Sequence, residues 1–165
     1  MGDNKAVLEE GQRRLAVQLK RIGGYTLRTC VDSRKKSLVD VIAPDGRVAR
    51  AVVKSSNGGS WQLNLNHFLV IDFDEATGIQ RIKEDAAIPA PKQPVLLVWL
   101  GDTKRKPDSY FVLTMSDLQR CVRQNHEWYL GQHGGKRPHT QGSMHTRVEP
   151  AHLVKHKDRW DLLFA

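Results

Sequence analysis

The amino-acid sequence predicts an α/β fold with a mixed central β-sheet flanked by helices. Three observations lead to this expectation. The segment Leu38 to Ser56 has the pattern of two strands joined by a tight turn. Two short apolar runs, FLVIDF at 68–73 and PVLLVWL at 94–100, are typical of buried strands. Helical spacing of apolar residues precedes the hairpin and recurs at 117–130.

The first predicted element is a helix from Asn4 to about Ile22. Asn4 can cap this helix because its side-chain oxygen can accept hydrogen bonds from the free amides of the first turn. Gly23 and Gly24 supply a stop signal at the other end. The apolar stripe that we expect to face the core consists of Leu8, Leu15, Leu19 and Ile22.

A strand from Tyr25 to Cys30 and then the hairpin are expected next. The turn chemistry of the hairpin comes from Pro44, Asp45 and Gly46. Side chains alternate across a strand, so Arg50, Val52 and Lys54 share one face. The ammonium of Lys54 follows an apolar strand and requires an anionic partner, for which Asp40 on the first strand is the nearest candidate.

The second half of the chain predicts further strands and one more long helix. Ile79 to Lys83 reads as an edge strand and Tyr110 to Leu113 as a further strand. Ser116 is the expected cap of a helix from Asp117 to Leu130, which Gly131 ends. The apolar residues that this helix offers to the core are Leu118, Cys121, Val122 and Trp128.

A long segment rich in Gly, His and Pro follows, up to Pro150. Loops of that length are usually functional or disordered. A short helix at Ala151 to Lys157 and a final strand at Arg159 to Phe164 are expected to close the fold. The 165 residues suit a single domain, 1–165, and the sequence has no internal repeat.

An Asp and a Lys on paired strands after a helix resemble the core of the PD-(D/E)XK nuclease superfamily. In that family an Asp on one strand and an acid-x-Lys on the next hold a divalent metal and orient a water that attacks phosphate. The segment Gly11 to Leu27, GQRRLAVQLKRIGGYTL, is similar to the family's opening helix, with its Gly-Glu near the start and its terminal Gly-Tyr. The resemblance implies a restriction-endonuclease-like core, followed here by a C-terminal helix, a long loop and a terminal strand.

The sequence departs from the family pattern at Val52, where the strand acid is usual, and at Gln12, where the helix Glu is usual. By resemblance, Asp40 would bind Mg²⁺, Lys54 would polarise the attacking water or the phosphate, and Glu9 or Gln12 would complete the site. Glu9 can stand in for Gln12 because residues three apart share a helix face. Two versions follow from these departures. In the first version, the protein is an active magnesium-dependent DNA endonuclease. In the second, its metal site is depleted and the same cleft binds nucleic acid without cutting it. The losses at Val52 and Gln12 favour the second version.

Charge points to a polyanionic partner, with 26 Lys and Arg against 18 Asp and Glu and a net charge of +8. Nucleic acid is the natural candidate, with DNA favoured. Few aromatic residues are interleaved with the basic ones, which favours contact with a duplex backbone over a stacking platform. The basic residues occur in clusters, one of which is Lys104 to Lys106. The residues that we expect to contact nucleic acid are Arg13, Arg14, Lys35, Lys36, Lys136 and Arg137.

Two other classes of function stay open at this point. The protein could be a protein-interaction or regulatory module in a defence or mobile-element system, in which the basic faces bind an acidic protein. A homodimer is also compatible with the sequence. Alternatively, histidines form a metal site while Asp40 and Lys54 are only structural. The histidines in question are His133, His139, His145, His152 and His156, the last two being four residues apart.

The remaining sequence features concern redox state and location. Cys30 and Cys121 have no metal-binding or redox spacing, so we expect reduced thiols. No apolar run approaches the ~20 residues that span a bilayer, and the charged N-terminus lacks a signal-peptide core. These features predict a cytoplasmic protein that does not insert into membranes.

Overall fold

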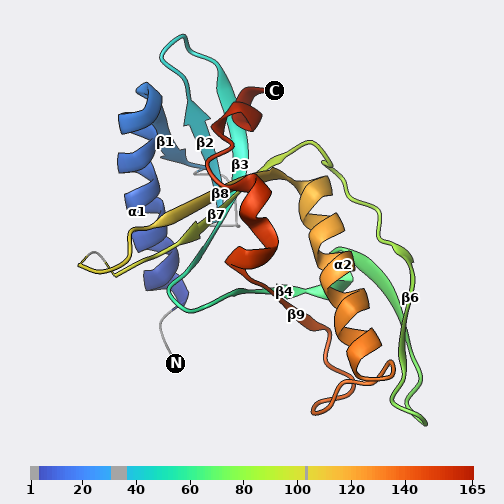
Figure 1. Cartoon of the computed structure of the whole chain (residues 1–165). Coiled ribbons are helices and arrows are strands. Elements are labelled where there is room, and N and C mark those ends of the chain that lie inside the picture. Colours follow the sequence, from blue (N-terminus) through green and yellow to red (C-terminus); the bar gives the residue numbers. More distant parts are fainter. Residues whose placement is uncertain (1–3, 31–36, 103) are drawn as a thin grey trace.

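The computed structural model describes residues 4–30, 37–102 and 104–165, and it shows a mixed α/β fold. A five-stranded sheet has the order β1-β2-β3-β7-β8. Helix α1 (Asn4–Gly23) packs on one face of this sheet, and helix α2 (Met115–Gln132) packs on the other (Figure 1). The predicted combination of a mixed sheet with flanking helices is therefore confirmed at this level.

The central sheet is built around the predicted hairpin. Its strands are β1 (Thr26–Thr29), β2 (Leu38–Ile42), β3 (Val48–Ser56), β7 (Pro94–Trp99) and β8 (Ser109–Thr114). The β3 and β7 strands pair in parallel, and the other neighbours pair antiparallel. In the turn of the hairpin Gly46 has a φ of 89°, a left-handed conformation that glycine adopts without steric cost.

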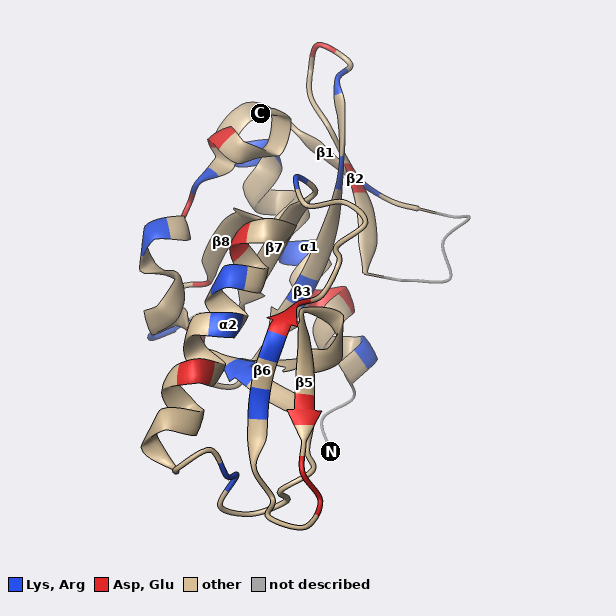
Figure 2. Cartoon of the chain, turned by 90° about the vertical axis from the view of Figure 1, so that its right-hand side faces the viewer, with Lys and Arg blue, Asp and Glu red and all other residues tan. Residues whose placement is uncertain are grey.

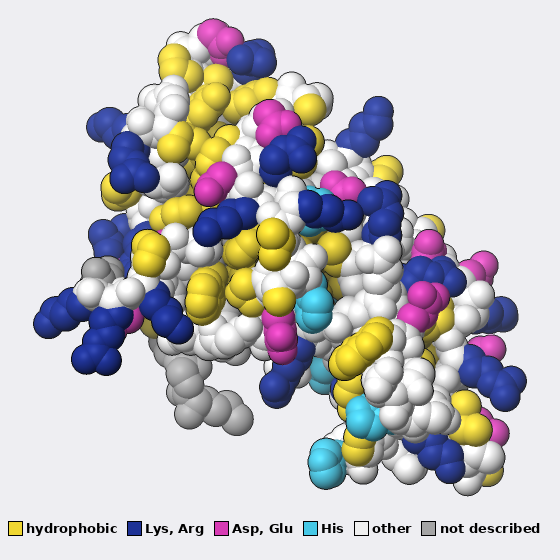
Figure 3. Space-filling view, viewed as in Figure 1, with side chains coloured by type: hydrophobic (Ala, Val, Ile, Leu, Met, Phe, Trp, Pro, Cys, Tyr) yellow, Lys and Arg dark blue, Asp and Glu magenta, His cyan; other side chains and the backbone are white. Residues whose placement is uncertain are grey.

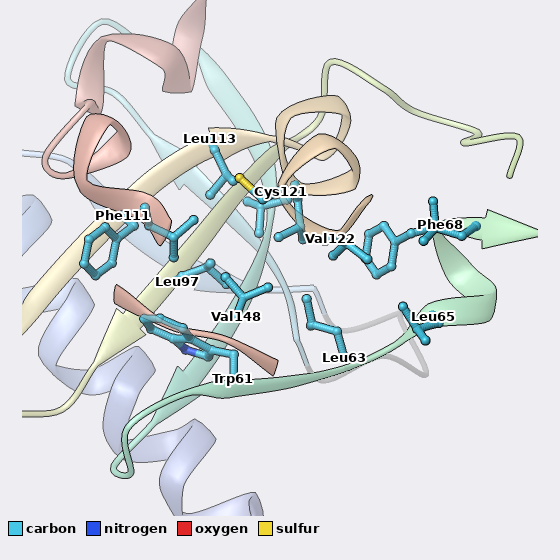
Figure 4. Close-up of a cluster of buried hydrophobic side chains, with 14 residues drawn as sticks. Trp61, Leu63, Leu65, Phe68, Leu97, Phe111, Leu113, Cys121, Val122 and Val148 are labelled. Atoms are coloured by element: carbon cyan, nitrogen blue, oxygen red, sulfur yellow. The ribbon is translucent and has the colours of Figure 1, made fainter. Parts of the chain in front are cut away.

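Alternation along the central strands divides the core in two. Residues such as Val53 and Leu96 face α1 and pack against its buried Leu15 and Leu19. The intervening residues face α2, where Leu97, Phe111 and Leu113 meet Cys121 and Val122 (Figure 4). The same strands thus supply both layers, because successive side chains point to opposite faces.

Helix α1 lies unusually close to β3 at Gly11. A Cβ atom at position 11 would overlap the side chain of Ser55 on β3. Glycine is therefore required here by the approach of the helix to the sheet, independently of any motif. This contact fixes the height of α1 against the end of β3, and with it the positions of the charged residues on the outer face of α1.

Two small sheets lie beside α2, outside the central sheet. One pairs β4 (Trp61–Asn64) with β9 (His145–Val148), and the other pairs β5 (Leu69–Phe73) with β6 (Gln80–Asp85). The edge strand expected at 79–83 therefore exists, but its partner is β5. The strand at 68–73 is not the buried strand that we expected, because alternate positions such as Val70 and Asp72 are exposed.

The long segment after α2 is held against β6 by Gln80. Gln80 Nε2 donates hydrogen bonds to the backbone oxygens of Gln141 at 2.8 Å and Ser143 at 3.1 Å. Its Oε1 lies 3.1 Å from Nε2 of the fully buried His126 on α2. Burial lowers the pKa of His126 to about 4, so its ring is neutral near pH 7. Part of the segment also forms β9, so this region is ordered.

The predicted helix 117–130 is confirmed, with a different cap. The side-chain oxygen of Thr114 accepts a hydrogen bond from Asp117 N at 3.1 Å, while the Asp117 carboxylate accepts from Thr114 N at 3.2 Å. Thr114, and not Ser116, is therefore the cap. Trp128 was expected in the core but is 64% exposed. The rest of the described chain leaves this part of the helix surface largely uncovered.

The last elements are short 3₁₀ helices, η2 (Pro150–His156) and η3 (Trp160–Phe164), and a similar turn, η1 (Leu65–His67), follows β4. The terminal strand predicted at Arg159 to Phe164 is wrong. Trp160 and Phe164 pack instead against Tyr110 and Tyr25, with ring centroids 5.7 and 5.6 Å apart. No helix in the described residues combines the length and the apolar character needed to cross a bilayer.

Candidate nucleic-acid interface

Asp40 lies in the middle of the β2 strand with an arginine on each side. The strand register places Arg28 of β1 and Arg50 of β3 opposite it. Arg50 Nε donates to Asp40 Oδ1 at 3.0 Å, and the Nη2 atoms of both arginines lie 3.4 Å from Oδ2. The hydrogen bonds from Arg50 and then Arg28 hold the pKa of Asp40 below its usual range, although burial opposes them. Asp40 is thus an ionised, nearly buried carboxylate whose oxygens already have two cationic partners.

The sequence led us to expect Lys54 beside Asp40, but the structure places these two residues apart. Alternation places both side chains on the same face of the sheet, but Lys54 lies four residues beyond Arg50 along β3. At about 3.3 Å per residue this separation is about 13 Å, too far for an ion pair. The partner that the register gives to Asp40 is Arg50.

The helix residues that were expected to complete a metal site lie elsewhere. Glu9 is exposed, and its Oε1 lies 3.9 Å from Lys5 Nζ. Gln12 is half-buried beside the contact of Gly11 with Ser55, on the face of the sheet opposite to that of Lys54. Within the described ranges no three His, Cys, Asp or Glu side chains gather in a way that could hold a metal ion.

The histidines of the C-terminal region take on separate structural surroundings. His152 is exposed, and its Nδ1 accepts a hydrogen bond from the backbone of Glu149 at 3.0 Å. His156, four residues later, is buried, and its pKa is lowered by that burial. The spacing of these two residues does not join them to a third described ligand, so the structure assembles no histidine metal centre in the part of the chain that it describes.

Two of the predicted basic residues, Arg13 and Arg14, lie beside a loop that is distant in sequence. Arg14 Nη1 donates to Asp108 Oδ1 at 2.7 Å and lies 3.3 Å from the backbone oxygen of Gly101. Asp108 Oδ1 also accepts a hydrogen bond from Gly101 N at 2.9 Å. Both ends of the loop between β7 and β8 are therefore fixed to α1.

This arrangement creates one basic surface from two parts of the chain. A hollow of about 320 Å³ lies between α1 and the start of β8, and Asp108 and Tyr110 form its strand side. Figure 3 shows Lys and Arg side chains gathered on the left of the molecule, over α1 and the loop before β8. We call this the α1-loop surface, and we define it by six residues: Arg13, Arg14, Arg21, Lys104, Arg105 and Lys106.

The electrostatics of the α1-loop surface favour an anionic ligand. Its six cations stand against the carboxylates of Glu10, Asp102 and Asp108. Hydrogen bonds from Arg13 and then Arg14 lower the pKa of Glu10 to about 2, so this carboxylate is charged and already paired. Burial, with the nearby charge of Asp108, raises the pKa of Tyr110 to about 12, so the hollow ends in a neutral hydroxyl. The surface can bind phosphate through guanidinium and ammonium groups.

The other predicted contact residues do not join this surface. Lys136 and Arg137 lie beyond the C-terminal end of α2, far from α1 (Figure 1). The guanidinium of Arg137 stacks over the ring of Tyr129, 5.2 Å from its centroid. Lys35 and Lys36 lie outside the described residues. Sequence reasoning missed Asp108, whose role as the anchor of the loop has no local signature.

No family model, no curated protein and no solved structure matches this chain.

Proposed function

We propose that this protein binds nucleic acid, with DNA as the first candidate, through the α1-loop surface. The observation that carries this proposal is the 2.7 Å contact between Arg14 and Asp108, which holds the basic loop against the basic face of α1. Charge that is scattered over a protein contributes mainly to solubility, whereas cations held together on one surface can neutralise several phosphates at once.

The dimensions of the surface fit a phosphate backbone. Arg13 and Arg21 are eight residues apart on α1, which corresponds to about 12 Å along the helix axis. One DNA strand carries a phosphate about every 3.4 Å of duplex axis, so this distance spans about three to four phosphates. The loop from Lys104 to Lys106 adds cations beside the helix. Contacts of this kind fix position on a backbone and carry no base sequence.

We further propose that the core is PD-(D/E)XK-like and that its metal site is depleted. The order of a helix, an antiparallel three-stranded unit and then a parallel strand supports the likeness. The two guanidinium groups on the Asp40 carboxylate support the loss of metal binding, because a divalent cation would have to displace them. Val52 supplies no oxygen at the position where the family has its strand acid. Binding without cleavage is thus favoured over an active endonuclease.

The test is the salt dependence of duplex binding by the wild-type chain. Arg14 is held by Glu10 and Asp108, so five cations of the surface remain, and if each neutralises one phosphate, log K should fall with log salt with a slope of about −4 to −5. A polyglutamate with the same net charge as the duplex serves as the comparison ligand. Tighter binding of the duplex supports the proposal, whereas no binding of the duplex at 50 mM salt, or equal affinity for polyglutamate, would favour an acidic protein as the partner.

A further inference from the structure

We infer that the hollow between α2 and η2 binds an unstacked nucleobase, so that the protein prefers single-stranded or frayed nucleic acid. This inference rests on the proposed function and extends it to a second site. The hollow has a volume of about 350 Å³ and is lined by Cys121, Gln124, Asn125, Trp128 and His152. That volume lies within the range of small-molecule pockets, roughly 300–1,000 Å³.

The wall of the hollow is a single stripe of α2. The stripe begins at Cys121 and continues three, four and seven residues later with Gln124, Asn125 and Trp128. This spacing places the four residues on one helix face. Cys121 is buried at the core end of this stripe, while Trp128 is 64% exposed. Single exposed apolar residues are ordinary on proteins. An indole and an imidazole that line the same hollow are different, because a planar base can stack there.

The polar groups around the hollow can recognise the edge of a base. The Nδ2 of Asn125 already donates hydrogen bonds to Arg147 O at 2.6 Å and to Thr146 Oγ1 at 3.3 Å. These bonds fix the amide and leave its Oδ1 as an acceptor. No hydrogen bond to another described residue engages the side chain of Gln124, which offers both a donor and an acceptor. A side-chain amide with that pair can meet the N6 and N7 atoms of adenine.

His152 contributes a donor of defined position. Its Nδ1 accepts a hydrogen bond from Glu149 N at 3.0 Å. In the neutral imidazole the proton must then be on Nε2, on the opposite side of the ring. The five lining residues therefore provide a stacking surface, two amides and one N–H donor.

The surrounding charge favours a nucleotide over an apolar peptide. Lys155 and Arg120 lie close enough to Cys121 for their charges to act on its thiol, although burial dominates and raises its pKa. Arg147, whose backbone oxygen holds Asn125, is exposed on β9. The nearby Asp117 is paired with Arg120 at 3.1 Å. Asp117 and Arg120 thus offset each other, and Lys155 remains as a cation for the phosphate that accompanies a bound base.

The experiment uses two DNA ligands. One is single-stranded dA12 in which one base is 2-aminopurine, and the other is the duplex that this strand forms with dT12. Wild-type protein should bind the single strand more tightly than the duplex and should quench 2-aminopurine emission by stacking. Trp128→Ala should weaken single-strand binding between about 5- and 150-fold and should leave the duplex affinity unchanged. Trp128→Phe, which keeps a ring, should lose less than Trp128→Ala.

Val154→Ala is the matched control, since Val154 is an apolar residue of η2 that is 72% exposed and does not line the hollow. This variant should bind the single strand as the wild type does. If Trp128→Ala binds dA12 like the wild type while duplex binding keeps its salt dependence, the inference is wrong and the proposed function stands. If neither form of DNA binds to the wild type, both are wrong.

Discussion

Arg14 and Asp108 form an ion pair across 94 positions of sequence, with 2.7 Å between Nη1 and Oδ1. Their side chains are only 22% and 17% exposed. This pair links α1 to the loop before β8 and so decides whether the cations of the two segments act together.

Asp108→Asn separates the effect of loop position from the effect of charge. The substitution removes a negative charge, so attraction of a polyanion by net charge alone would become stronger. We expect weaker duplex binding instead, because Arg14 and Gly101 N lose their shared carboxylate and the loop is released from α1. Unfolding free energy should fall by about 1–2 kcal/mol. Glu9→Gln is the control, since it removes an exposed carboxylate of α1 and should leave duplex affinity equal or slightly stronger. The same change in duplex affinity in both variants would contradict the positioning role of Asp108.

Asp40→Asn tests the interpretation of Asp40 as the carboxylate that holds Arg28 and Arg50. Both guanidinium groups are exposed, so solvent screening limits the expected loss of stability at pH 7 to about 1 kcal/mol. The folded-state pKa of Asp40 lies below its ordinary value of 3.8. Its contribution is therefore complete above pH 3.8 and disappears as the pH falls through the folded-state pKa. Urea denaturation over a series of pH values should show the full deficit of the variant at pH 7 and a deficit that shrinks as the pH falls below 3.8.

The same pair of proteins tests the depleted metal site. Mg²⁺ should shift the urea midpoints of wild type and Asp40→Asn equally, and neither protein should nick a plasmid above background. Stabilisation by Mg²⁺ of the wild type alone, or nicking that Asp40→Ala and Lys54→Ala abolish, would make Asp40 a metal ligand after all.

Gly11→Ala should destabilise the fold although alanine is the better helix former. The new Cβ would overlap the Ser55 side chain, and overpacking of this kind costs about 1–3 kcal/mol. Ser55→Gly in the same chain removes the obstructing atoms and should restore part of the lost stability. A double-mutant cycle in urea measures this coupling. Equal unfolding midpoints for Gly11→Ala and wild type would show that α1 is not held at this distance from β3.

His126 should make the protein sensitive to mild acid. Its folded-state pKa is about 4 against an ordinary 6.5, so between these values the unfolded chain binds the additional proton. Stability is therefore complete above pH 6.5 and falls as the pH is lowered towards 4, by about 3 kcal/mol at most. His126→Gln, which retains a donor for Gln80, should remove most of this slope in denaturation measured from pH 7 to pH 4. An unchanged slope would place the responsible group elsewhere.

Local patterns were sufficient for the elements whose signals are local. The hairpin was predictable because turn residues and alternation lie within one short segment, and the register then follows from the turn. The strand expected at 159–164 failed because a short apolar run fits a strand and a buried helical turn equally well. The neighbours that decided this case, Tyr110 and Tyr25, are far away in sequence.

The candidate sites depended on contacts that no local pattern reveals. Arg13 and Arg14 were predictable as exposed bases of a helix, but their union with the loop required Asp108. Asp40 is the exception, because counting residues from the turn of the hairpin pairs it with Arg50, so the expected pairing with Lys54 was wrong on local grounds alone. Trp128 has helical spacing with the core residues of α2, and its exposure reflects only what the rest of the chain leaves uncovered.

The most direct test of the account is the salt dependence of duplex binding in two doubly substituted proteins of equal net charge. Arg13→Ala/Arg21→Ala removes two cations of the α1-loop surface, and Arg81→Ala/Lys83→Ala removes two exposed cations from β6, on the far side of the fold (Figure 2). We predict that the first protein loses about two units of slope in log K against log salt, while the second keeps the wild-type slope. Equal losses in both proteins would show that net charge, and not this surface, attracts the nucleic acid.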